Sequence, residues 1–285
     1  FTAPLWLGLR NASDMWPTPS PMSLIYKSGD DLRQDAFTLL LIRAMDRLWQ
    51  ENGMDMRVTP YRVVATGRAC GFIEVVPNAK TTAQISQSAG GVSAVFRKTP
   101  LADWLKKHNP STPAYARAVD NFVRSCAAYV VATYVIGIQD RHNDNIMIAE
   151  SGHLFHIDFA HFLGNVMKFG AFNREKAPFV FEPSMAYVMG DEGSPTFSRF
   201  VALCCKAYNV IRHNGNFIMN LFVMMLSSNI PQVSSIADLQ YLQKSLQLQK
   251  TDSEASSHFT ALLFESLRTR RTQINGAVHI LAKRL

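Results

Sequence analysis

The sequence predicts an α+β fold of two lobes, a small β-rich lobe over residues 1–76 and a larger, mainly helical lobe over residues 77–285. Two observations carry this prediction. Short apolar runs bounded by Gly, Pro, Asn and Ser, which are typical of strands, are concentrated before Pro77. Beyond Pro77, most of the chain repeats apolar residues at three- and four-residue spacing, which is typical of helices. Because one short connector joins the lobes, we expect a ligand site in the cleft between them.

The small lobe is expected to contain four strands and one helix. Asp30 and Asp31 stand where the dipole of a helix favours acidic residues, and an apolar stripe follows them as far as Gly53. The expected helix is Asp30–Gln50. The expected strands are Pro4–Leu9, Met22–Tyr26, Val58–Thr66 and Cys70–Val76, and the last two form a hairpin around Gly67.

The large lobe is expected to contain seven helices and one hairpin. The hairpin joins Ile146–Ala149 to Leu154–Ile157 through a four-residue loop, Glu150–His153. The expected helices are Thr81–Ser88, Pro100–His108, Pro113–Ile138, Phe197–His213, Phe217–Ser227, Ile236–Leu248 and Asp252–Ala282.

The composition is that of a globular protein. Hydrophobic residues make up 47% of the 285 residues and charged residues 18%, which excludes the disordered and low-complexity classes. The longest mainly apolar run, Ala127–Ile138, is shorter than the roughly 20 residues of a membrane-spanning helix, so no transmembrane segment is expected. The cysteines, Cys70, Cys126, Cys204 and Cys205, lack metal-ligand spacing and favour a reducing, cytoplasmic compartment.

The balance of charge favours an anionic partner. The chain has 29 Lys and Arg residues against 22 Asp and Glu residues, a net charge of +7. This surplus fits a phosphate-rich ligand or an anionic membrane surface, and it is too small to require nucleic acid. No nucleic-acid partner is expected.

The polar segment Asp140–Asn145 follows an apolar helix and precedes the predicted hairpin. Pairing Ala149 with Leu154 in that hairpin puts Asn145 opposite Asp158, and directly opposed residues have Cβ atoms about 5 Å apart. An amide oxygen and a carboxylate at that distance can share one Mg²⁺. The alternative interpretation is a polar turn whose side chains cap one another.

Two further features fit phosphoryl transfer. Asp140 precedes Asn145 by five positions, the interval between the base and the metal-binding Asn in the catalytic loop of protein kinases. Lys27 ends an apolar strand and can contact the phosphates of ATP, with Asp35 on the following helix as the carboxylate that holds it. The alternative for Lys27 is a solvated lysine at a strand end.

Three blocks resemble the catalytic domain of a phosphoinositide 3-kinase: Lys27–Asp35, Asp140–Asn145 and His156–Phe159. The resemblance extends over nearly all of the 285 residues. It implies a protein-kinase-like fold whose small lobe is truncated at its start, with a catalytic loop at residues 137–145. It also implies transfer of the γ-phosphate of ATP to the inositol 3-hydroxyl, with ATP and Mg²⁺ as cofactors.

The resemblance implies an ATP site between the lobes. Lys27 would bind the phosphates, and Asp35 and Tyr61 would line an inner pocket. The connector Glu74-Val75-Val76 would bind adenine through the carbonyl of its first residue and the amide of its last. The walls of the purine slot would be Pro4, Trp6, Ile25, Ile73, Met147, Phe155 and Ile157.

The resemblance also implies the residues of the transfer itself. Asn145 and Asp158 would hold Mg²⁺. Either Asp140 or His142 would take the hydroxyl proton or stabilise the transferring phosphoryl group, because both side chain types can act as a base.

Residues 158–182 would form the activation loop that reads the lipid headgroup, through Lys168, Arg174 and Lys176. Relatives that use phosphatidylinositol 4,5-bisphosphate tend to carry more basic residues in the first half of this loop. The expected substrate is therefore phosphatidylinositol or its 4-phosphate, in an anionic membrane surface.

Several segments resemble the class II subfamily: Asn173–Phe179, Phe200–Asn209 and Thr251–Ala255. The connector Glu74–Val76 instead matches class I, so a class I-like kinase acting on the 4,5-bisphosphate is an alternative. A related Ser/Thr protein kinase is a second alternative. A catalytically impaired scaffold is a third, because Ala160 stands where the family's Asp-Phe-Gly motif has Gly.

We expect a cytoplasmic protein that acts at the periphery of membranes. Its further partners would be other domains of the same longer chain and a regulatory protein.

Overall fold

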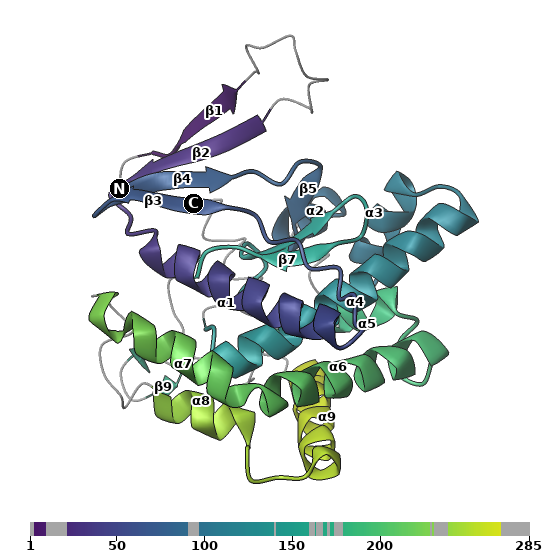
Figure 1. Cartoon of the computed structure of the whole chain (residues 1–285). Coiled ribbons are helices and arrows are strands. Elements are labelled where there is room, and N and C mark those ends of the chain that lie inside the picture. The colour runs from purple at the N-terminus through teal and green to yellow at the C-terminus, as the bar shows by residue number, and fades with distance from the viewer. Residues whose placement is uncertain are drawn as a thin grey trace.

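The computed structural model describes residues 3–9, 22–90, 97–139, 141–159, 163, 168–169, 172–173, 179–228, 230 and 239–268. Figure 1 shows a small sheet at the N-terminal end, with helix α1 (Arg33–Glu51) lying beneath it and a mainly helical region beyond. The predicted fold, a small sheet-containing lobe followed by a larger helical one, is confirmed. The exact lobe boundary after residue 76 stays a prediction.

The sheet of the small lobe has four antiparallel strands in the order β1-β2-β4-β3. These are β1 (Leu5–Leu9), β2 (Met22–Ser28), β3 (Val63–Gly67) and β4 (Cys70–Glu74). Helix α1 begins three residues later than predicted. Gly29 has a positive φ of 96° and its amide donates to the Ala69 carbonyl, so residues 29–31 form a turn held to the β3–β4 hairpin.

A second sheet carries the polar segment near residue 145. Its order is β5-β6-β7, from Ala79–Thr81, Ile146–Ala149 and Leu154–His156. Strand β5 was not expected, because three residues are too few for a periodic pattern. It pairs Thr81 with Met147, and so attaches the start of the large lobe to the hairpin.

The predicted register of this hairpin is wrong by one residue. Ile148 pairs with Leu154 and Ile146 with His156, so the loop has three residues, 150–152, instead of four. Gly152 has φ +93°, and three-residue hairpin loops place a glycine in this left-handed region. Asn145 consequently lies opposite Ile157, whose amide donates to the Asn145 carbonyl at 3.0 Å, and it does not lie opposite Asp158.

The helices of the large lobe largely match the prediction. Helix α5 was missed, because six residues give too little periodicity, and so was the short pair of β8 (Lys168–Phe169) and β9 (Phe172–Asn173). Beyond residue 268, the predicted last helix lies outside the described residues. The described helices are α2 (Thr82–Ser88), α3 (Pro100–His108), α4 (Thr112–Ile136), α5 (Pro183–Val188), α6 (Pro195–His213), α7 (Gly215–Met225), α8 (Leu239–Leu246), α9 (Asp252–Arg268) and a 3₁₀ turn at Leu226–Ser228.

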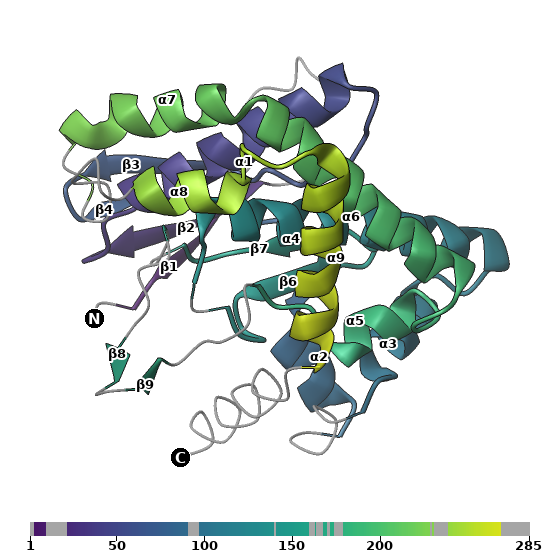
Figure 2. The same cartoon turned by 90° about the horizontal axis from the view of Figure 1, so that it is seen from below.

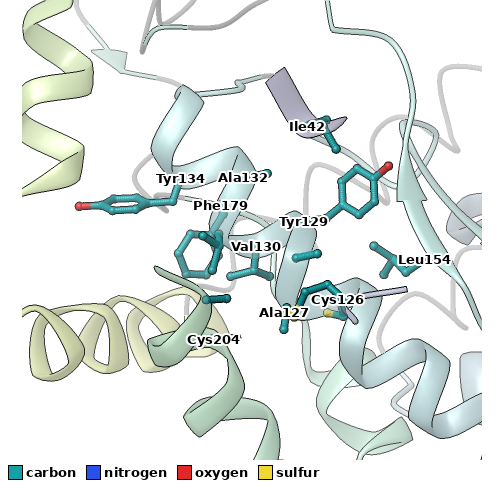
Figure 3. Packing of buried hydrophobic residues seen from close by; sticks show 14 of the residues in the cluster. Ile42, Cys126, Ala127, Tyr129, Val130, Ala132, Tyr134, Leu154, Phe179 and Cys204 are labelled. Atoms are coloured by element: carbon teal, nitrogen blue, oxygen red, sulfur yellow. The ribbon is translucent and has the colours of Figure 1, made fainter. Parts of the chain in front are cut away.

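Helix α4 is the centre of the large lobe. Its C-terminal half is buried on all sides, and Figure 3 shows its side chains packed against Ile42 of α1, Leu154 of β7 and Cys204 of α6. Figure 2 shows α6 and α9 crossing on the same lobe. Gly137, with φ +69°, ends α4 in the left-handed conformation. The polar segment therefore follows directly after the buried end of α4.

Candidate active site

One face of the small sheet carries Lys27 and the predicted walls of the purine slot. Trp6 pairs with Ile25, and Ile25 pairs with Ile73, so the three side chains share a face. Lys27 follows Ile25 by two positions and shares that face. Trp6 is 65% exposed and Pro4 is also exposed. The structure thus brings these predicted residues together around an open apolar surface.

The carboxylate that pairs with Lys27 is Asp30, not Asp35 as predicted. Lys27 Nζ lies 3.1 Å from Asp30 Oδ2, because the turn at residues 29–31 brings this aspartate beside the end of β2. Partial burial alone would lower the pKa of Lys27, but Asp30, Asp158 and Asp35 outweigh it and raise the pKa above its ordinary value. Lys27 is therefore charged, and Asp158 lies within electrostatic reach of it.

Asp35 serves a different purpose. Its Oδ1 accepts a hydrogen bond from the Phe159 amide at 3.0 Å. Burial raises the pKa of Asp35 to about 6, against the opposing effect of this hydrogen bond. Tyr61 lies buried nearby, with its ring 6.2 Å from the ring of Phe155. Burial, and then the Asp35 carboxylate, raise the pKa of Tyr61, so the two side chains are neighbours. Phe155, a predicted wall of the purine slot, is fully buried, and the inner pocket stays a prediction.

The connector between the lobes is held to the small sheet, and its role as the adenine site stays a prediction. The Val75 amide donates to Ser23 and the Glu74 amide to Arg62, both through backbone carbonyls. The Arg62 amide donates to the Glu74 side chain at 2.9 Å, and so does not occupy the Glu74 carbonyl. Half-buried Val76 follows directly.

The polar loop before the hairpin is held by the start of α2. The Asn143 carbonyl accepts from the Ala83 amide at 2.9 Å and from the Thr82 hydroxyl at 3.0 Å. Within the loop, the Asp144 amide donates to Nδ1 of His142 at 3.2 Å. A backbone amide can only donate, so neutral His142 carries its proton on Nε2. Asp140 lies outside the described residues.

Sequence reasoning gave no role to Arg141, which joins the polar loop to the segment after β7. Arg141 is buried and donates to the carbonyls of Ile157 (2.7 Å) and Asp158, and its guanidinium lies 5.6 Å from the centre of the Phe159 ring. An arginine held by carbonyls and by an aromatic face is fixed in position. Its position in the sequence, between the candidate catalytic residues Asp140 and His142, could have indicated this role.

Asp158 has the left-handed φ of +59° and an exposed side chain. For a residue other than glycine, this conformation costs about 1 kcal/mol or more, and it persists where the surroundings enforce it. Asn145 and Asp158 offer an amide oxygen and a carboxylate, which are hard ligands that suit Mg²⁺. The Asp158 carboxylate also lies within electrostatic reach of Lys27, and the donor types of Asn145 and Asp158 fit the metal.

Of the remaining predicted residues, Met147 is half-buried on β6 and packs against the core. Lys168 lies on β8, where its backbone pairs with Asn173. Arg174 and Lys176 lie outside the described residues. In the part of the chain that the structure describes, no helix has both the length and the apolar character needed to cross a membrane.

Comparison with known proteins identifies the family. A family model described as phosphatidylinositol 3- and 4-kinase matches residues 21–235. Phosphatidylinositol 3-kinase 3 of Dictyostelium discoideum is 52% identical over 281 residues, which are 99% of this chain and 16% of that protein. Phosphatidylinositol 4-phosphate 3-kinase C2 domain-containing subunit beta of Homo sapiens is 47% identical over 282 residues, 98% of this chain and 17% of that protein.

The chain therefore belongs to the phosphatidylinositol 3- and 4-kinase family, and the resemblance found in its sequence is confirmed. Its relatives are named as kinases, the enzyme class that the sequence predicts. The chain spans about one sixth of the length of these two relatives.

Proposed function

We propose that this chain is the catalytic domain of an ATP-dependent phosphoinositide 3-kinase of class II type, acting on phosphatidylinositol or its 4-phosphate. The observation that carries the proposal is that α1 of the small lobe binds Phe159, the neighbour of Asp158, through hydrogen bonds, with Lys27 within electrostatic reach of Asp158. It joins a phosphate-binding cation on the small lobe to a metal-binding carboxylate on the large lobe, as phosphoryl transfer requires.

Different side chains of this chain have different roles in phosphoryl transfer. Lys27 neutralises the ATP phosphates, and Asn145 and Asp158 hold Mg²⁺, which when bound spreads the charge developing on the phosphate oxygens. His142, protonated on Nε2, can donate a hydrogen bond to the transferring phosphoryl group but cannot accept a proton there. On this proposal Asp140 is the base, and the hydrogen bond to Nδ1 of His142 supports this choice.

The choice of lipid rests on charge. Lys168, Arg174 and Lys176 are three cations in residues 158–182, and Glu175 offsets part of them. Three cations suffice for the bridging phosphate and one ring phosphate, and leave little for a second ring phosphate. The name of one relative, a phosphatidylinositol 4-phosphate 3-kinase, supports this choice. On this proposal the protein works at the surface of an anionic membrane.

A lipid panel tests the proposal. Vesicles of matched surface charge would carry phosphatidylinositol, its 4-phosphate or its 4,5-bisphosphate, and labelled ATP would report transfer, with Asp158→Asn as an inactive control. We expect turnover of the first two lipids well above that of the third, and Val166→Lys with Met167→Lys should raise use of the third. Preference for the bisphosphate would favour a class I type. Transfer to a peptide but to no lipid would refute a lipid kinase, and ATP turnover absent with every acceptor would indicate a scaffold.

A further inference from the structure

We infer that Gln34 is a positioning residue for Asp158, holding it from the small lobe in the conformation that binds the metal. Gln34 lies on the first turn of α1 and is only 6% exposed. Its side-chain Nε2 donates to the Phe159 carbonyl at 2.6 Å, across 125 positions of sequence. The inference deepens the proposed function and rests on it.

The corrected register of the hairpin explains why such a residue is needed. Asn145 lies opposite Ile157, so the side chains of this pair share one face of the β6–β7 hairpin. Regular alternation would send the next side chain, that of Asp158, to the opposite face. The left-handed φ of Asp158 ends the alternation at that residue. Bringing the carboxylate to the amide of Asn145 therefore depends on an unfavourable backbone conformation.

Hydrogen bonds fix the peptide groups on both sides of this conformation. Arg141 donates to the carbonyls of Ile157 and Asp158. Asp35 accepts from the Phe159 amide, and Gln34 donates to the Phe159 carbonyl. Consecutive residues of one helix thus bind the amide and the carbonyl of the residue next to Asp158.

Gln34 is the member of this group that can be tested without changing charge. Arg141 and Asp35 act on their neighbours by charge as well as by hydrogen bonds, so substituting either one changes the electrostatics of the cleft. Gln34 is neutral. If its amide is removed, the Phe159 carbonyl loses this donor, and the cost of an unsatisfied buried acceptor favours a rearrangement of this peptide group. The left-handed turn at Asp158 then loses one of its constraints.

The experiment compares Gln34→Met with Gln50→Met, the same change on an exposed residue at the far end of α1. Mn²⁺ serves as the probe, and its binding to the protein–ATP complex is followed by electron paramagnetic resonance. ATP binding without metal is measured by calorimetry, and folding by thermal unfolding. Gln34→Asn, which keeps an amide but shortens its reach, is the second variant should Gln34→Met fail to fold.

We expect Gln34→Met to weaken Mn²⁺ binding about tenfold, the usual effect of losing a group that orients a metal ligand. Binding of metal-free ATP should stay within about twofold of the parent, Gln34→Asn should be intermediate, and Gln50→Met should match the parent. Unchanged Mn²⁺ affinity in a folded Gln34 variant would overturn the inference. So would an equal loss of metal-free ATP binding, which would show that α1 is displaced as a whole. A parent protein that binds Mn²⁺ and ATP but phosphorylates no lipid would instead refute the proposed function, and a parent that fails to bind Mn²⁺ would refute both.

Discussion

Replacing Asp35 with Asn should stabilise the protein at neutral pH. Burial raises the pKa of this carboxyl group from 3.8 to about 6, so at pH 7.5 the folded state holds a charge in an unfavourable environment. The amide oxygen of Asn can still accept the hydrogen bond that the Phe159 amide donates to Asp35. Asp35→Asn therefore removes the cost of the charge and keeps the contact.

The magnitude follows from the shift in pKa. A difference of about two units between the unfolded and folded states corresponds to about 3 kcal/mol. Asp35 keeps part of its solvent exposure, and screening by water reduces the effect. We expect Asp35→Asn to raise the free energy of unfolding at pH 7.5 by about 1–2 kcal/mol.

The direction of the pKa shift determines how the stability difference between Asp35→Asn and the parent changes with pH. A raised carboxyl pKa means that the folded state binds the proton more tightly than the unfolded state does, so the parent gains stability as the pH falls. The advantage of Asp35→Asn should thus be complete at pH 7.5, shrink as the pH falls through about 6, and vanish below about 4. Urea unfolding followed by tryptophan fluorescence over this range measures the difference.

Asp31→Asn is the control, for which we expect the opposite change in stability at pH 7.5. The hydrogen bond from Arg33 lowers the pKa of Asp31, so this carboxylate stabilises the folded state above its ordinary pKa, and the stabilisation is lost at low pH. Asp31→Asn should lower stability at pH 7.5 and match the parent in acid. The reasoning fails if Asp35→Asn is less stable than the parent at pH 7.5, or if its advantage persists unchanged at pH 4.

Two further predictions concern the phosphate site and the hairpin. Lys27→Ala should lower kcat/KM for ATP by at least about a hundredfold. Lys27→Arg should lower it as well, because a guanidinium fork does not replace a compact ammonium. Lys80→Ala is the exposed control, and a Lys27→Ala rate equal to that of the parent would exclude the phosphate-binding role. Gly152→Ala should lower the free energy of unfolding by at least about 2 kcal/mol, because φ is +93° and a Cβ would run into the Ala118 carbonyl. Gly8→Ala, which meets nothing, should cost far less, and equal unfolding midpoints for the two variants would contradict this account.

The sequence predicts most of the larger elements because their signals are local. Helix α3 begins with Pro100 at its first position and ends with basic residues in its last turn, and its predicted bounds, Pro100–His108, are those observed. The motif residues Lys27 and Asp158 come close enough for their charges to interact, and their shared role in one site stays a prediction. Type and spacing carry this information without any knowledge of distant contacts.

The prediction failed where a tertiary contact determines the local structure. The four polar residues after Ala149 allow a loop of three or four, and Gly152 selects three because it packs against Ala118 of α4 in a left-handed conformation. The partner of Lys27 was misassigned for a similar reason. A bond between Gly29 and Ala69 of the neighbouring hairpin forms the turn that presents Asp30, and no pattern in either segment records it.

Helix α1 couples the position of the small lobe to the geometry of the candidate active site. Gln34 and Asp35 on its first turn hold the carbonyl and the amide of Phe159, and the Arg33 guanidinium donates to the Ser228 carbonyl at 3.1 Å. The first turn of α1 is thus hydrogen-bonded to the large lobe at two separate places. Lys27 and Asp30 precede it by one short turn and are joined to each other by an ion pair. Any displacement of α1 relative to the large lobe must therefore stretch the bonds that shape Asp158 at the same time as it shifts Lys27, so the phosphate-binding and metal-binding halves of the cleft are set together.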